Sequence, residues 1–271
     1  SATLSFSLTE DERFFREASF EKGGKVVFRR ARDAAAGRFI EAETVRVVAW
    51  PGSSRVSRVE AEGGCRLSLA DPSGPSGTVR AAVVRLDFDR EGKLAGWTAD
   101  GGAGMSLDEG TEAARAASGQ TIVYSEPDGL LTISAGPGEV AGLEDAKFRV
   151  EAPEVAIQAG PKDFRASGGV QCLLKPRPAG AAVGFFSGDK AVFVASRSLR
   201  LADGGRRVRF EGEVRAWQDA ASLQAADLEV VEATGEVRAS GGVLVVLPRA
   251  GRKPGEDRSV EAGGEEMAYS P

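Results

Sequence analysis

A pair of adjacent glycines recurs along this chain, each time beside a short stretch in which apolar and polar residues alternate. Four copies read as two small or polar residues, Gly-Gly and then a segment typical of a strand, over residues 61–69, 99–107, 166–174 and 239–247. Weaker glycine marks, which bring the spacing to between 29 and 44 residues, lie at Gly23-Gly24, Gly136-Gly138 and Gly212. A repeat of this length indicates stacked supersecondary units that cover one another's apolar faces.

The last two copies also match in the residues that precede them. Six apolar residues, Val150, Ala152, Val155, Ile157, Phe164 and Ala166, lie 73 residues before Leu223, Ala225, Leu228, Val230, Val237 and Ala239. The end of the chain, residues 262–270, resembles residues 117–125, which continue into a further strand-like segment. We therefore expect either an array cut from a longer one or a last repeat that forms a degenerate cap.

Between the glycine pairs the pattern has period two, as in the alternation of Val208, Phe210, Val214 and Ala216 with Arg209, Glu211, Glu213 and Arg215. Alternation predicts half-buried strands, and short strands between glycine-rich turn signals predict an all-β sandwich, barrel or solenoid. Each Gly pair is expected to form a sharp turn or a bulge, with a positive φ at one glycine. Two helix signals, Thr9-x-x-Glu12 and Ser106-x-x-Glu109, fit either a helix or a strand or loop with polar ends.

Composition restricts the chemistry open to the chain. Its 271 residues include no histidine, which excludes Ser-His-Asp and Cys-His catalysis and histidine-ligated zinc. A net charge of −5 with interspersed signs argues against a nucleic-acid binder. No apolar run reaches the roughly 18 residues of a membrane-spanning helix. We therefore expect no enzyme activity, no metal and no cofactor.

The cysteines and tryptophans each leave two interpretations open. Cys65 and Cys172 fit no metal-binding spacing, and we interpret them as small buried apolar residues. The alternative is a disulfide, which would require an oxidising compartment. Trp50, Trp97 and Trp217 lie near expected strand ends, where packing is the favoured role and a sugar-stacking platform is the alternative.

The segment 208–243 carries three motifs in order. They are Val208-x-Phe210-x-Gly212-x-Val214, then Leu223-x-Ala225-x-Asp227-Leu228-x-Val230, then Gly235-x-Val237-x-Ala239-x-Gly241-x-Val243. In this order they resemble the organic-solvent-tolerance and lipopolysaccharide-transport family of periplasmic β-jellyrolls. Residues 117–136 resemble the strand–turn–strand unit of the same family.

The resemblance implies an all-β, elongated and twisted β-jellyroll or solenoid of repeated short antiparallel strands, with few or no helices. We expect N-terminal degenerate repeats at 1–110, C-terminal repeats continuous with them at 111–250, and a tail or the start of a further repeat at 251–271. The implied function is non-enzymatic. A periplasmic bridge component of a Gram-negative cell would bind lipopolysaccharide through its lipid A and carry it between inner and outer membranes. Its partners would be homologous jellyrolls or further copies, joined by end-strand pairing.

An apolar groove between the sheets would hold the acyl chains, because each buried CH₂ group contributes about 0.8 kcal/mol. The residues expected to line this groove are Val150, Val155, Ile157, Phe164, Val170, Val208, Phe210, Val214, Leu223, Ala225, Leu228, Val230, Val237, Val243 and Val245. The alternative for each of them is packing in a dry core. Two other functions compete with lipid transport: a surface or adhesion β-solenoid without lipid cargo, and a polysaccharide-acting parallel β-helix enzyme. The enzyme should show one charge-rich repeat, which this sequence lacks.

Overall fold

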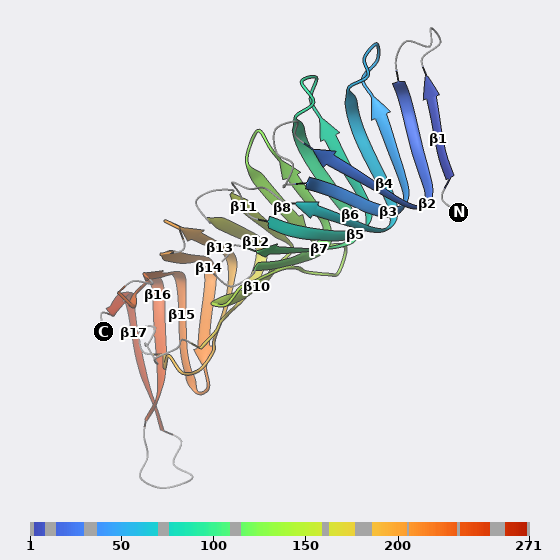
Figure 1. The fold of residues 1–271 in the computed structure, drawn as a ribbon. Coiled ribbons are helices and arrows are strands. Elements are labelled where there is room, and N and C mark those ends of the chain that lie inside the picture. Colours follow the sequence, from blue (N-terminus) through green and yellow to red (C-terminus); the bar gives the residue numbers. More distant parts are fainter. Residues whose placement is uncertain are drawn as a thin grey trace. The chain divides into compact units, whose positions relative to one another are not determined.

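The computed structural model describes residues 3–8, 15–29, 37–69, 76–108, 115–158, 163–176, 186–204, 206–231, 234–249 and 258–269. The chain divides into two compact units, Ser1–Gly138 and Glu139–Pro271. All the regular elements of the described ranges are β-strands, with no helix among them (Figure 1). The predicted fold class, an all-β jellyroll type of repeated antiparallel strands, is therefore confirmed.

The first unit is an antiparallel meander in which each strand pairs with the next along the chain. Its strands are β1 (Thr3–Leu8), β2 (Phe15–Arg29), β3 (Gly37–Ala49), β4 (Val56–Leu69), β5 (Ser76–Phe88), β6 (Leu94–Asp108), β7 (Arg115–Ser125) and β8 (Leu130–Ser134). Figure 1 shows the long strands of this unit side by side and curved along their length. Strands reach 15 residues, longer than expected, because the glycine pairs lie inside strands instead of ending them.

The second unit repeats this plan. Its strands are β9 (Ala141–Glu144), β10 (Phe148–Ala152), β11 (Glu154–Gln158), β12 (Phe164–Leu174), β13 (Val192–Ala202), β14 (Arg207–Gln218), β15 (Ala221–Val231), β16 (Glu236–Arg249) and β17 (Arg258–Tyr269). From β12 onwards each strand pairs antiparallel with the next, whereas β10 and β11 pair with the two halves of β12. Pro153 separates these two short strands because proline has no N–H to donate to a ladder.

A two-residue bulge interrupts every second long strand. In β4, Gly63 and Gly64 face the single residue Ala82 of β5, and the pairing register shifts there. Both glycines have a positive φ, 81° and 59°. The same arrangement recurs at Lys22-Gly23, Gly101-Gly102, Gly168-Gly169, Gly212-Glu213 and Gly241-Gly242. These six glycine marks are thus bulges, one of the two expected alternatives, and both bulge residues are left-handed where only one was expected.

The first residue of a bulge touches the neighbouring strand, and the second does not. A Cβ atom added to Gly101 would lie 2.6 Å from the Cβ of Ala82. Nothing lies within 4 Å of a Cβ built on Gly102. At Gly101 glycine is therefore favoured for its size and its backbone, and at Gly102 only for its backbone, although the bulge of β2 has Lys22 at its first position. The second position can consequently hold Glu213, at a φ of 55°.

The 73-residue register is a structural repeat. Pro153 faces the bulge at Gly168 in the way that Ala226, 73 residues later, faces the bulge at Gly241. A Cβ on Gly168 would meet the Pro153 ring at 3.0 Å, and a Cβ on Gly241 would meet the Ala226 Cβ at 2.5 Å. The matched apolar residues therefore occupy equivalent rows of the sheet, as the sequence predicted.

The bulges also decide which side chains face inwards. On a strand that faces a bulge, the buried residues follow the spacing i, i+2, i+5, i+7, as in Val79, Ala81, Val84 and Leu86. A strict period of two would turn half of such a strand inside out. The neighbouring strand has one extra residue in its bulge, and this residue compensates for the spacing of three between i+2 and i+5. Apolar side chains on both sides of the bulge therefore lie on one inner face.

In the second unit the sheet folds over along the line of bulges. Phe164 precedes the Gly168-Gly169 bulge of β12, whereas Phe148 of β10 pairs with Leu174 at the far end of the same strand. The two phenyl rings are nevertheless only 5.2 Å apart between centroids. The two arms of the sheet therefore face each other across an apolar interior.

At two places the structure selects one of the alternatives that the sequence left open. Ser106 lies in β6, and Ala116 and Ala117 lie in β7, so the strand alternative replaces the helix that Ser106-x-x-Glu109 suggested. Residues 109–114 are outside the described ranges, as is the other helix signal, Thr9-x-x-Glu12. The glycine mark at Gly136-Gly138 is not a bulge, because Gly138 takes its φ of 78° in a turn after β8.

Candidate functional site

The interior of the second unit contains every residue that the sequence predicted to line a groove. All of them face inwards, and all except Val208, which is half-buried, are buried. Phe210, Leu223, Val150 and Val155 are 0% exposed. The structure thus brings residues from β10 to β16 into one apolar layer enclosed by the two arms of the sheet.

The first unit has an equivalent interior that the sequence reasoning did not single out. Its fully buried residues include Ile40, Val45, Val59, Val79, Val84, Ile122 and Ile133. The spacing i, i+2, i+5, i+7 would have found part of it, because Ile40, Ala42, Val45 and Val47 follow that spacing on β3. A search for uninterrupted period-two alternation misses this pattern.

The inner face becomes accessible at β17. Five residues of this strand lie in the inner-face rows of β16: Val260, Ala262, Gly264, Met267 and Tyr269. Val260 is 49% exposed, Ala262 is exposed, and Met267 and Tyr269 are half-buried. Within the described ranges β17 pairs with β16 alone. One place therefore combines exposed apolar side chains with an unpaired strand edge, a combination typical of interaction sites.

The cysteines are structural. Both thiols are free and buried, so the apolar interpretation is confirmed and no disulfide joins them. The Sγ of Cys65 donates to the carbonyl oxygen of Ala82 at 3.3 Å. Burial raises the pKa of the Cys65 thiol and raises the pKa of the Cys172 thiol to about 12. Thiols that stay protonated at neutral pH are poor nucleophiles.

The tryptophans occupy different environments. Trp97 is 3% exposed and so cannot stack on a sugar, and the Nε1 of half-buried Trp50 donates to the carbonyl oxygen of Asp89 at 3.2 Å. Trp217 lies on the outer face of the second unit, 41% exposed. Its ring stacks on Phe193, 46% exposed, with centroids 5.6 Å apart and planes 12° apart. Trp217 is the most exposed of the three tryptophans and is therefore the one best placed to meet a sugar.

The described ranges contain no group of three or more His, Cys, Asp or Glu side chains that could hold a metal ion. A separate search of those ranges finds no helix with the length and apolar character needed to cross a membrane.

Strands bent at glycine bulges around a shared apolar interior define the class of protein: an all-β, jellyroll-like fold. No protein-family model matches the sequence, and no curated protein matches it. Among solved structures, the chain is similar to LptH from Pseudomonas aeruginosa, described as the LptA-homologous periplasmic component of the lipopolysaccharide transport device. The identity is 8% and the TM-score 0.40, over 55% of this chain and 93% of that one.

Proposed function

We propose that this chain is a non-enzymatic carrier of lipopolysaccharide in the periplasm and a component of a bridge between the inner and outer membranes. It would hold the acyl chains of lipid A in its apolar interior and leave the phosphorylated sugar outside. The proposal is supported by the ordered motifs of residues 208–243 and by the apolar layer that those residues form.

The observation that carries the proposal is the exposure of the inner face at β17. Met267 continues the row of buried Ala239 and Val260 the row of half-buried Leu247, but both β17 side chains are accessible to solvent. An apolar chain that emerged from the interior would meet these side chains first. Exposed apolar side chains beside an unpaired strand edge are typical of an interaction site.

The interior must open to admit a cargo, because its side chains now pack against one another. The contact between Phe148 and Phe164 joins the two arms of the sheet in the second unit. An acyl chain would replace such contacts with its own methylene groups, each of which contributes about 0.8 kcal/mol when buried. Transport would then consist of exchanging equivalent apolar contacts along the interior, with no covalent step.

A photocrosslinker tests this proposal most directly on β17. Met267 points to the inner face and Ala268 to the outer face of the same strand. With a benzophenone amino acid at position 267, we expect ultraviolet light to link the protein to lipopolysaccharide. The same probe at position 268 is the matched control and should crosslink only weakly. Equal yields at the two positions, or none at either, would contradict the proposal.

A charged residue deeper in the interior is a poor test. Phe210 is 0% exposed, so Phe210→Glu would bury an unpaired carboxylate and unfold the second unit. Loss of lipid crosslinking in that variant would report on folding instead of on binding.

The unpaired edge of β17 is the proposed docking site for a homologous jellyroll or another copy of this chain. Backbone groups of an edge strand pair readily with another strand, and inward-pointing charges block such pairing. We expect the protein to associate as its concentration rises in sedimentation velocity runs, and Val260→Lys to abolish the association. Glu261→Lys, on the opposite face of the strand, is the control. A wild-type chain that stays monomeric at high concentration, with no partner crosslinked, would refute this docking site.

A second candidate function, glycan adhesion without lipid cargo, is favoured by the exposed Phe193–Trp217 stack, because exposed aromatic faces bind sugar rings. Mass spectrometry of the purified protein separates the two functions. Co-purified lipid A would support transport, whereas lipid-free protein whose glycan binding is lost in Trp217→Ala would support adhesion.

A further inference from the structure

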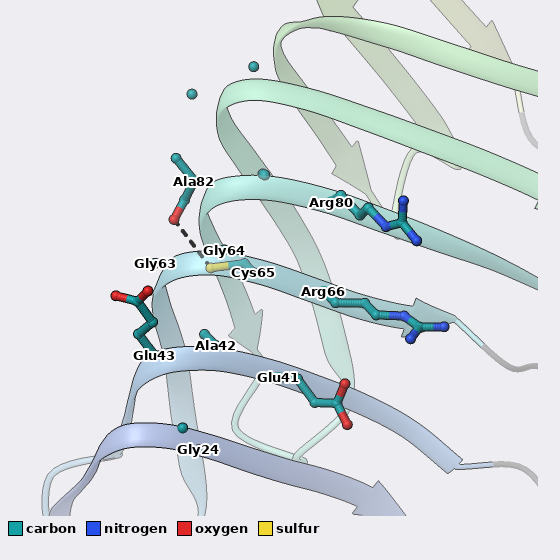
Figure 2. Close-up of a pocket in the computed structure, with 14 residues that line it drawn as sticks. Gly24, Glu41, Ala42, Glu43, Gly63, Gly64, Cys65, Arg66, Arg80 and Ala82 are labelled. Carbon is teal, nitrogen blue, oxygen red and sulfur yellow. Dashed lines mark hydrogen bonds between the residues drawn. The ribbon is translucent and has the colours of Figure 1, made fainter.

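Two arginines lie side by side on the outer face of the first unit, beside the line of bulges. Arg66 of β4 and Arg80 of β5 are direct cross-strand partners, and both are exposed. Figure 2 shows their guanidinium groups extending in the same direction from neighbouring strands. Like charges that face each other directly across two strands destabilise a sheet. Arginines are also direct partners at Arg200 and Arg209 of the second unit, but there Arg209 forms an ion pair with Glu211 at 2.9 Å.

On the other side of the bulges, β3, β4 and β5 have no such pair of like charges. There Arg46 of β3, Glu60 of β4 and Arg85 of β5 are consecutive cross-strand partners with alternating charge. Their ion pairs measure 3.6 Å and 3.4 Å. In the part of the chain that the structure describes, no ion pair or hydrogen bond engages the guanidinium of Arg66 or Arg80. The charge ladder is thus completed on one side and left incomplete on the other.

Among the described residues, no carboxylate is an adjacent cross-strand neighbour of Arg80. Its direct partner on β6 is Gly104, and the next row outwards consists of Ser68, Thr78 and Ser106. The nearest acid in its own row, Glu41 of β3, lies beyond Arg66. Glu43 lies at the bend, apart from the two guanidinium groups (Figure 2). Arg80 is therefore surrounded by arginine, glycine and hydroxyl side chains, and Glu41 in the same row is the direct partner of Arg66, not of Arg80.

The arginines also border a surface pocket of about 900 Å³. Most of its lining is glycine and alanine from the bulges, including Gly63, Gly64 and Gly101, and the carboxylates of Glu41 and Glu43 also border it. Ligand-binding pockets have volumes of about 300–1,000 Å³. The space is therefore large enough for a headgroup of many atoms.

We propose that the Arg66–Arg80 pair and the adjoining pocket bind a phosphate group. Strands are about 4.8 Å apart, so two neighbouring guanidinium groups can each donate hydrogen bonds to oxygens of one phosphate. Arginine suits this task because its planar fork matches phosphate geometry and it remains charged. A bound phosphate would supply the negative charge that the ladder lacks. The site is on the outer face, so it does not depend on the proposed acyl-chain carrier function.

The test uses the full chain and two probes, sodium tripolyphosphate and vesicles of phosphatidylglycerol in phosphatidylcholine. Tripolyphosphate binding is measured by calorimetry, and vesicle binding by co-sedimentation at low ionic strength, where screening is weak. Binding of tripolyphosphate assigns the site to a soluble phosphate, and binding of vesicles alone assigns it to a lipid headgroup. Vesicles of phosphatidylcholine alone should not bind.

The deciding variant is Arg80→Glu, which removes one cation and places a carboxylate opposite Arg66. Because it completes the alternating ladder, its urea midpoint should equal or exceed that of the wild type. Its affinity for the probe should nevertheless fall by at least about tenfold. Arg66→Gln supplies a second variant, with a smaller loss of affinity, should Arg80→Glu fail to fold.

Arg215→Glu is the matched control, because Arg215 occupies the corresponding row of the second unit between the uncharged residues Ala195 and Gln224. It changes the net charge by the same amount and should retain the affinity of the wild type. An equal loss in Arg215→Glu, affinity within twofold of wild type in Arg80→Glu, or no wild-type binding to either probe would overturn the proposal.

Discussion

Phe148 and Phe164 meet with their ring centroids 5.2 Å apart, although they lie on opposite arms of the folded sheet in the second unit. Both are buried, at 7% and 4% exposure. Truncating either ring to alanine should lower the free energy of unfolding by about 3–5 kcal/mol. A double-mutant cycle in urea should give a coupling of about 0.5–1.5 kcal/mol between them.

The control cycle pairs Phe148→Ala with Trp217→Ala, because Trp217 lies on the outer face and stacks on Phe193 instead. Those two changes should be additive within about 0.5 kcal/mol. A coupling between Phe148 and Phe164 no larger than that of the control would mean that the two arms do not close on each other in solution.

The two glycines of one bulge should differ in their tolerance of a methyl group. Gly102→Ala places alanine at a positive φ with open space around it and should destabilise the protein by about 1–2 kcal/mol. Gly101→Ala adds a clash with the Ala82 Cβ, so its loss in chemical denaturation should be larger by a further 1 kcal/mol or so. Equal losses would show that the first bulge position has room for a Cβ atom.

Glu213 is the one described non-glycine residue at the second position of a bulge, at a φ of 55°. Glu213→Gly should stabilise the protein by about 0.5–1 kcal/mol, because a left-handed conformation is unfavourable for residues with a Cβ. The change also removes the ion pair with Arg197, but both side chains are over 70% exposed, so little is lost.

Thermal and urea unfolding of Glu213→Gly should be compared with those of Glu211→Gly. Glu211 lies in the regular ladder of the same strand, paired with Asp227, so glycine there should destabilise by about 0.5–1 kcal/mol. If both variants lose stability, the backbone at position 213 is not strained.

Alkaline pH should weaken the second unit through Cys172. The pKa of this thiol is raised from an ordinary value of 9.0 to about 12 by burial. Between these values the folded chain keeps the proton and the unfolded chain loses it, so stability falls as the pH rises from about 9 towards 12. Cys172→Ala should therefore show a smaller loss than the wild type in urea unfolding between about pH 8 and pH 10.5. Parallel losses in the two proteins would contradict the assignment to this thiol.

Local pattern predicted the strand class and much of the inner face. The alternation around Phe210 and the 73-residue register between Val150 and Leu223 both hold in the structure, because side chains of a strand alternate between its faces whatever surrounds it. The interior of the first unit escaped prediction. Its odd spacing, as between Ala81 and Val84, makes sense only when the bulge on the neighbouring strand is known.

The sequence by itself determined that the chain forms antiparallel β-strands with glycine pairs at regular places and an apolar face. Those features depend on the conformational preferences of single residues and on short-range spacing. Only the tertiary structure decided that the glycine pairs bend long strands instead of ending them, and that Phe148 and Phe164 meet. It alone placed Arg66 opposite Arg80. Cross-strand register fixes these relationships, and register arises from the pairing of strands that no local pattern encodes.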